Sequence, residues 1–281
     1  MRVNNKFLKY GGGILLILIL ETVILSYVAL IIGKYTIIPL GLQQYISYQF
    51  FYKVIVIIAA IIVARILGIT LYFKLPNRQR TPYLMFMLPV VITATITVIK
   101  IVTEHQNMAD IFKNLSMALS ISIAEDLFSW GIVLVLLLRI FSQISSSNRY
   151  SYAILISGGL SAALHSMNFL EQNVLVTIVQ VTFTLGMGTL LGMTYLRSGS
   201  LLIPILIHTT WDFPLIFNKV AINATMTGHQ FGSASLFMTF ICASMIVYSL
   251  VAVNPNNIHD ELKNNLEPMP LLSRLNIVHS T

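Results

Sequence analysis

The chain has 281 residues, of which 56% are hydrophobic and only 10% are charged, and its mean hydropathy is +0.82. This composition excludes an ordinary soluble domain and predicts a membrane protein that crosses the bilayer several times. The formal net charge of +7 comes mostly from single basic residues beside apolar segments, so it indicates membrane topology rather than nucleic acid as a partner.

Eight apolar segments are long enough to cross a hydrocarbon core of about 30 Å, which needs roughly 20 helical residues. They lie near residues 11–32, 51–73, 83–102, 115–139, 151–170, 174–196, 200–217 and 235–253. We therefore predict an all-α, polytopic helical membrane protein with about eight transmembrane helices. The single cysteine, Cys242, lies in the last segment, so an internal disulfide is excluded.

Basic residues near the ends of these segments predict their direction, because Lys and Arg favour the cytoplasmic side. With a cytoplasmic N-terminus, the inner side carries Arg2, Lys6, Lys9, Lys74, Arg78, Arg80, Arg139, Arg149, Arg197, Lys263 and Arg274. The outer side carries Lys34, Lys53, Lys100, Lys113 and Lys219. Both termini are then cytoplasmic. We expect a single transmembrane domain over residues 1–253 and a flexible cytoplasmic tail over residues 254–281.

Three of the segments carry ionisable side chains at bilayer depth, where such groups are costly and usually mark a functional site. The fourth segment carries Glu125 and Asp126, the fifth carries His165, and the seventh carries His208 and Asp212. His208 and Asp212 are four residues apart and so lie on one helix face. The two adjacent acids point about 100° apart, so we expect only Glu125 to face the histidines.

The main candidates can meet in one layer of the membrane. Counted at about 1.5 Å per residue from Arg139, Arg149 and Arg197 as the inner boundary, they lie roughly 16 to 24 Å deep. These candidates are Glu125, His165, His208 and Asp212. Their common depth favours one site built from three helices.

Other polar and small residues in the apolar segments are interpreted as structural. Glu21 is expected to pair with Arg65, which spares both an unpaired charge in lipid. Small residues in the fifth and sixth segments predict close helix packing. They are Ser157, Gly158, Gly159, Gly186, Gly188 and Gly192.

Three motifs within about residues 115–217 resemble those of the CPBP family of intramembrane proteases, which includes CAAX proteases, Abi and bacteriocin-processing proteins, and Rce1. That family carries E-E-x-x-x-R, F-x-x-x-H, and H-x-x-x-N or H-x-x-x-D, each on its own transmembrane helix. The corresponding residues here are Glu125, Asp126 and Trp130, then Ser161 and His165, then His208 and Asp212. The most specific stretch is GMGTLLGMTYLRSGSLLIPILIHTTWDFP. Trp130 and Ser161 depart from the family's Arg and Phe.

The resemblance implies a peptide-bond hydrolase in which Glu125 activates a water molecule, with His165, His208 and Asp212 around it and Asp126 in support. A carboxylate in a low-dielectric cavity binds protons more readily, which suits it to take a proton from water. The histidines would stabilise the developing oxyanion. A rival description places a zinc ion on His165, His208 and Asp212, with a zinc-bound water as the nucleophile. Both descriptions stay open.

The implied partner is a peptide or membrane-linked protein in a bacterial cell membrane, with bacteriocin self-immunity or peptide maturation as the expected setting. Trp130 leaves the acid pair without the motif arginine, so either one acid is protonated or a Lys or Arg from another helix substitutes. The alternative is a catalytically inactive regulator or scaffold of a sensor kinase or envelope enzyme, which Trp130 and Ser161 favour. A proton-coupled carrier would also use buried charges, but we find no convincing internal repeat.

Overall fold

The computed structural model describes residues 10–15, 28, 31, 34–35, 48–74, 83–104, 107–143, 146–170, 172–217 and 228–264. The helices within these ranges are α3 (Tyr48–Ile66), α4 (Tyr83–Thr103), α5 (Met108–Asp126), η4 (Leu127–Leu134), α6 (Val135–Ile140), η5 (Phe141–Gln143), α7 (Ser146–His165), η6 (Ser166–Leu170), α8 (Val174–Ser198), α9 (Leu202–Phe217), α11 (Gly228–Ala252), η7 (Pro255–Asn257) and α12 (Asp260–Asn264). The predicted all-α class is confirmed for the described part of the chain.

Within the described ranges, five helices are long and apolar enough to cross a membrane, which agrees with the predicted multi-pass membrane protein. They are Gln49–Ile66, Met108–Ile140, Asn148–Leu170, Val174–Ser198 and Ser235–Ala252. Two shorter apolar helices, Val90–Thr103 and Leu202–Ile216, fall in the third and seventh predicted segments. Most of the first predicted segment, with Glu21 of the expected pair with Arg65, lies outside the described residues. The number of eight spans and the cytoplasmic termini stay predictions.

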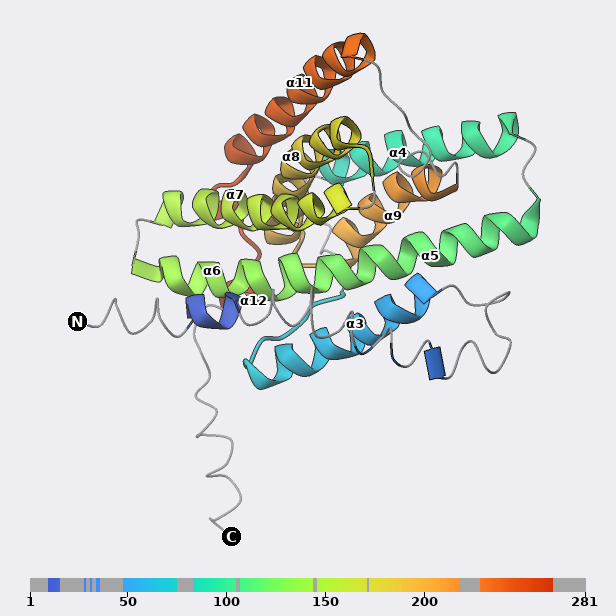
Figure 1. The fold of residues 1–281 in the computed structure, drawn as a ribbon. Helices are drawn as coiled ribbons and strands as arrows, with labels where there is room; N and C mark the ends of the chain where they lie inside the picture. The colour runs from blue at the N-terminus through green and yellow to red at the C-terminus, as the bar shows by residue number, and fades with distance from the viewer. Residues whose placement is uncertain are drawn as a thin grey trace.

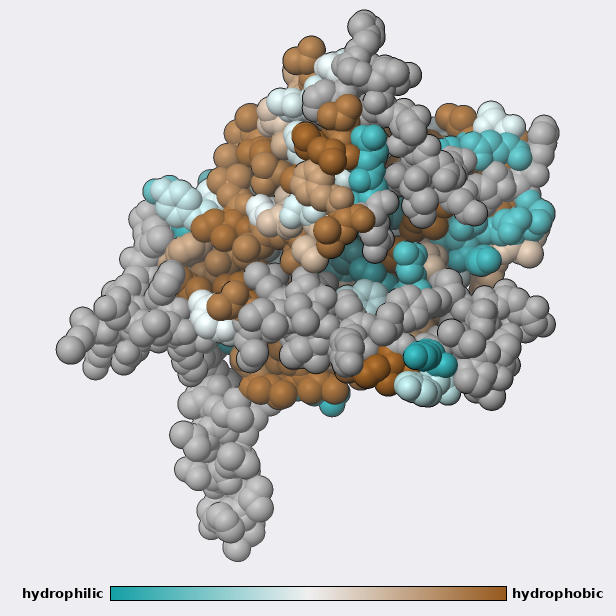
Figure 2. Space-filling model, viewed as in Figure 1, coloured by the Kyte–Doolittle hydropathy of each residue, from teal (hydrophilic) through white to brown (hydrophobic). Residues whose placement is uncertain are grey.

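One long helix forms the centre of the bundle. α5, η4 and α6 follow one another without a break, and most residues of their apolar part are buried, whereas few of those in α3 and α11 are. Figure 1 shows this helix in green, with α3 and α7 on either side of it. The outer helices present apolar side chains outward, as contact with lipid requires, and Figure 2 shows large apolar areas on the visible face.

α3 and the central helix run side by side in the same direction. Near one end, Nζ of Lys53 lies 2.7 Å from Oε1 of Glu125. Near the other end, Arg139, which is 2% exposed, donates from Nη1 to the carbonyl oxygen of Leu67 at 3.0 Å. The partners are 72 positions apart in the sequence in both contacts. The two helices are therefore parallel, and their residues stay aligned from one contact to the other. This direction agrees with the predicted topology, in which the second and fourth spans run the same way.

The central helix widens into a π-helical turn at η4, which begins directly after the acid pair. From α7, Oγ of Ser157 donates to the carbonyl oxygen of Ser129 in this turn at 2.8 Å. Trp130 packs on a face of α8 that carries no side chains. A Cβ atom on Gly188 would lie 3.2 Å from Cη2 of Trp130, and one on Gly192 would lie 3.3 Å from its Cε3. The glycines of α8 therefore make room for the indole ring.

Small residues also bring α7, α8 and α11 into close contact. A Cβ atom on Gly158 of α7 would lie 2.9 Å from the backbone nitrogen of Thr189 on α8. One on Gly186 would lie 2.7 Å from Cα of Cys242 on α11. The predicted close packing is confirmed at these positions. A Cβ atom on Gly159 would meet no atom within 4 Å in the structure as described, so Gly159 is not part of the contact.

The chain after α11 packs back onto the bundle. Arg197 of α8 donates from Nη1 to the carbonyl oxygen of Ala252 at 3.0 Å. Ile258 and Leu262 are 4% and 2% exposed. The segment predicted as a flexible tail therefore begins with packed residues, and its remainder after residue 264 lies outside the described residues. The domain boundary at residue 253 stays a prediction.

Candidate active site

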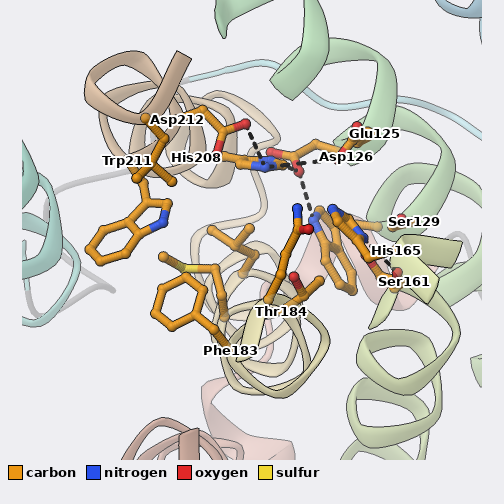
Figure 3. Close-up of a pocket in the computed structure, with 16 residues that line it drawn as sticks. Glu125, Asp126, Ser129, Ser161, His165, Phe183, Thr184, His208, Trp211 and Asp212 are labelled. Atoms are coloured by element: carbon orange, nitrogen blue, oxygen red, sulfur yellow. Dashed lines mark hydrogen bonds and ion pairs between the residues drawn. The ribbon is translucent and has the colours of Figure 1, made fainter. Parts of the chain in front are cut away.

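All the site residues predicted from the sequence line one pocket enclosed by the central helix, α7, α8 and α9. Figure 3 shows Glu125, Asp126, His208 and Asp212 together on one side of it, with Phe183 and Thr184 opposite. The cavity has a volume of about 80 Å³, which is room for several water molecules. Ionisable residues from three separate spans thus meet on one side of a small cavity.

Asp126 holds His208 in a fixed orientation. Nδ1 of His208 lies 2.9 Å from Oδ1 of Asp126, and Nε1 of Trp130 donates to the same carboxylate oxygen at 2.9 Å. Asp126 is 1% exposed, and its Oδ2 atom is buried without a hydrogen-bond partner in the described residues. Asp126 contacts Nδ1 of the His208 ring. The other ring nitrogen, Nε2, therefore faces the other acids.

The Nε2 atom of His208 lies between two further carboxylates. It is 3.3 Å from Oδ2 of Asp212, one turn along α9, and 3.9 Å from Oε2 of Glu125. The expectation that only one of the adjacent acids faces His208 is wrong. An imidazole presents two nitrogens on opposite sides of the ring, so Asp126 approaches one of them while Glu125 lies near the other.

The positive charge beside Glu125 comes from Lys53 of α3, which sequence reasoning missed. Nζ of Lys53 lies 2.7 Å from Oε1 of Glu125, and the two side chains are only 16% and 21% exposed. A signal was present in the spacing, because Val56, Ala60 and Ala64 follow Lys53 on one helical face and are all buried. The missing arginine left two alternatives, a protonated acid or a Lys or Arg from another helix. The structure contains such a lysine.

His165 lies at the C-terminal end of α7 and is held differently from His208. Its Nδ1 atom is 2.9 Å from the carbonyl oxygen of Ser161, one turn earlier in the same helix. Figure 3 shows His165 near Ser129 and Ser161, apart from the pair of His208 and Asp212. When Nδ1 donates to this carbonyl, Nε2 is the ring atom left for a substrate.

α4 fixes the part of α9 that carries His208 and Asp212. Pro214 has no N–H group, so the carbonyl of Thr210 loses its usual partner within the helix. Oγ1 of Thr97 donates to this carbonyl at 2.9 Å. The hydroxyl groups of Thr93 and Thr210 also lie 2.6 Å apart. These contacts provide the Thr210 carbonyl with a hydrogen-bond donor and hold the turn that Pro214 interrupts next to the pocket.

The opposite wall of the pocket is largely apolar. The rings of Phe183 and Trp211 stack with their centroids 4.6 Å apart and an interplanar angle of 19°. Met187 and Leu191, which follow Phe183 at helical spacing on α8, also line the pocket and are buried. A substrate entering the pocket would therefore meet carboxylates and imidazoles on one side and an aromatic and aliphatic surface on the other.

The predicted zinc ligands do not form a metal-binding group in this arrangement. Over the described ranges, no cluster of three or more His, Cys, Asp or Glu side chains has a geometry that could hold a metal ion. Of the predicted ligands, His208 is engaged with carboxylates through both nitrogens, and His165 is bound through Nδ1 to a carbonyl oxygen. The metal requirement stays a prediction, and we derive no step through an ion.

Comparison with known proteins agrees with the motifs. The family model "Type II CAAX prenyl endopeptidase Rce1-like" matches residues 107–214, from just before α5 to within α9. The predicted resemblance to the CPBP and Rce1-like family is therefore confirmed over this segment, which contains every predicted site residue. The match implies a CAAX-type intramembrane protease in general terms, with a peptide or protein substrate in a membrane. Neither the curated proteins nor the solved structures contain a match to the chain.

Proposed function

We propose that the Rce1-like segment makes this chain an intramembrane endopeptidase in which Glu125 activates the attacking water. The observation that carries the proposal is the separation of 3.9 Å between Oε2 of Glu125 and Nε2 of His208 inside the pocket. One water can lie about 2.8 Å from both atoms at this separation. Such a water would be held by a base and by an imidazole at once.

The proposed reaction uses the residues at these positions. Glu125 takes a proton from the water as its oxygen forms a bond to the carbonyl carbon of the substrate, and the carbonyl π electrons move to oxygen. His208, stabilised as a cation by Asp126 and Asp212, shifts its Nε2–H from Asp212 to the oxyanion as that charge develops. His165 supplies a second donor from the α7 side. The C–N bond then breaks, and Glu125 returns the proton to the leaving amine.

The pocket favours a substrate with an apolar side chain next to the cleaved bond. The stacked rings of Phe183 and Trp211, with Met187 and Leu191, would contact that side chain while the polar side holds the peptide group. Peptide maturation or bacteriocin self-immunity in a bacterial cell membrane is the setting we propose. A zinc-dependent version, with His165, His208 and Asp212 as ligands, needs a different arrangement of these side chains.

The second candidate is a catalytically inactive regulator or scaffold of a sensor kinase or envelope enzyme. The specific observation in its favour is Trp130, which stands at the position of the motif arginine and donates to Asp126. A scaffold keeps the packing of the site without needing its chemistry. The two candidates differ in what happens to other proteins in the membrane.

The test compares the protein termini of cells that carry wild type or Glu125→Ala at matched abundance, measured by mass spectrometry. The proposal expects a small set of termini that is present with wild type and absent with Glu125→Ala. Identical termini, together with a phenotype that still requires the protein, would support the scaffold and overturn the protease.

A further inference from the structure

The cation beside the catalytic carboxylate comes from a different helix than the motif indicates. In the family motif a single arginine follows the acid pair on the same helix, whereas this chain has Trp130 there. The indole of Trp130 donates to Asp126 at 2.9 Å and carries no charge. The ammonium of Lys53, on α3, lies 2.7 Å from Glu125.

We propose that Lys53 is a positioning residue for Glu125 and does the work of the missing arginine, which is divided here between two side chains. Trp130 supplies the hydrogen bond to Asp126, and Lys53 supplies the positive charge to Glu125. The inference rests on the proposed function, since it assigns Lys53 a role in the same reaction. Lys53 binds Oε1, whereas Oε2 is the oxygen nearer His208.

The charges around the site explain why this cation is needed. Among the described residues that line the pocket, the acidic ones are Glu125, Asp126 and Asp212, and those that can carry a positive charge are His165 and His208. Acidic groups this close disfavour one another's ionised forms in a low-dielectric environment. A general base has to be ionised before it can take a proton. Lys53 adds a permanent positive charge at the acid that must fill this role.

The position of Lys53 is fixed by packing and is not that of a side chain reaching for the membrane surface. The residues that share its helical face, Val56, Ala60 and Ala64, are 0%, 0% and 1% exposed. Farther along the same two helices, Arg139 binds the carbonyl oxygens of Leu67 and Gly68 at 3.0 and 3.1 Å. α3 is therefore tied to the central helix at two points.

The surroundings of position 130 suit a large uncharged ring better than a cation. Trp130 is 2% exposed, and its ring lies on the bare backbone of Gly188 and Gly192. An arginine there would leave part of this space empty, and its guanidinium would lie beside the carboxylate of Asp126, which already contacts Nδ1 of His208. The tryptophan and the lysine therefore form one coupled arrangement, in which the aromatic ring fills the space and the neighbouring helix provides the cation.

The test uses the full-length protein reconstituted in liposomes with a substrate identified from its cleaved termini. Lys53→Met removes the charge, Lys53→Gln keeps a hydrogen-bond donor without the charge, and Lys53→Arg keeps the charge. We expect kcat/KM to fall by about 100-fold for the Met and Gln variants, as when a reacting group is misplaced by about 1 Å. Lys53→Arg should stay within about tenfold of wild type. Lys113→Met, which removes an exposed lysine from α5, is the matched control and should cleave normally.

Infrared spectroscopy supplies a readout that a purely structural role would not move. In Lys53→Met near neutral pH we expect the carbonyl band of a protonated carboxyl group, and this band should disappear in the double variant Lys53→Met/Glu125→Gln. Lys53→Gln gives the same measurement if the Met variant does not fold.

The outcomes separate the inference from the proposed function. Normal cleavage by the folded Met or Gln variant, or loss of cleavage in Lys53→Arg equal to that in Lys53→Met, would overturn the role of Lys53 while the protease assignment stands. If wild type itself cleaves nothing, the proposed function fails, and the infrared band alone then decides whether Lys53 maintains the charge on Glu125. Absence of the band in both uncharged variants would overturn that pairing.

Discussion

The imidazole of His208 and the carboxylate of Asp126 lie 2.9 Å apart, Nδ1 to Oδ1, although the two residues come from different spans. This contact joins α9 to the central helix at the point where the π-helical turn begins. It places Asp126 at Nδ1 of His208, whereas Glu125 lies 3.9 Å from Nε2 and is the acid that we propose to activate water. The two acids of the motif therefore have different tasks, set by which nitrogen of one ring each approaches.

Asp126→Asn tests this division. The amide keeps the shape of the side chain but lacks the negative charge that stabilises protonated His208, so we expect kcat to fall by at least about 100-fold with little change in KM. Cleavage kinetics of the reconstituted protein measure both parameters. An unchanged kcat would show that Asp126 does not act through His208.

Trp130→Arg, which restores the family motif, should destabilise the protein. The indole is buried on two glycines of α8, and its loss should lower the free energy of unfolding by about 3–5 kcal/mol. Trp130→Phe is the matched control, because it retains an aromatic ring while it removes the hydrogen bond to Asp126, worth about 1 kcal/mol, and part of the contact with the glycines, so its loss should be smaller than that of Trp130→Arg. Unfolding in detergent micelles measures both changes. Equal stability of wild type and Trp130→Arg would contradict the packing account.

Gly158→Ala should separate α7 from α8 and disturb His165 at the end of α7. The added methyl group would lie 2.9 Å from the backbone nitrogen of Thr189, which cannot move aside easily, so we expect a loss of about 1–3 kcal/mol in the free energy of unfolding. Gly159→Ala, one position later, meets no described atom within 4 Å and should leave the stability unchanged or slightly increased. The same loss in both variants would indicate that helix contact is not the cause.

Thr97→Val should weaken the connection between α4 and α9. It removes the hydroxyl that donates to the Thr210 carbonyl beside Pro214, and we expect a loss of about 0.6 kcal/mol in stability, with a larger effect on kcat because α9 carries His208. Thr95→Val is the control, since Thr95 is exposed and donates within its own helix to Val91. A drop in kcat of the same size in the two variants would exclude the proposed positioning.

Much of the site could be predicted from the sequence, because ionisable residues are rare within apolar segments. Glu125, His165, His208 and Asp212 stand out for this reason, and the structure places all four in one pocket. The spacing of His208 and Asp212 also predicted correctly that they share one helix face, where they lie 3.3 Å apart. Their catalytic roles stay predictions, since proximity alone does not establish chemistry.

The remaining features depend on tertiary packing that a single sequence does not reveal. Lys53 stands near the end of an apolar segment, where a lysine usually extends to the membrane surface, so it was interpreted as a topology signal. Only the packing of α3 on the central helix directs it to Glu125. In the same way, Thr97 resembles the many threonines that bond to their own helix, and only α9 beside it gives it another partner.

The central claim is that Glu125 activates water for peptide-bond cleavage, and the most direct measurement uses purified protein. Wild type and Glu125→Gln, each reconstituted in liposomes, are added to solubilised membrane proteins from cells that lack the gene, and the new N-termini are quantified by mass spectrometry. The account predicts defined new termini with wild type and none with Glu125→Gln, although both variants insert and fold. The same new termini from Glu125→Gln, at the same rate, would contradict the assignment of Glu125 as the base.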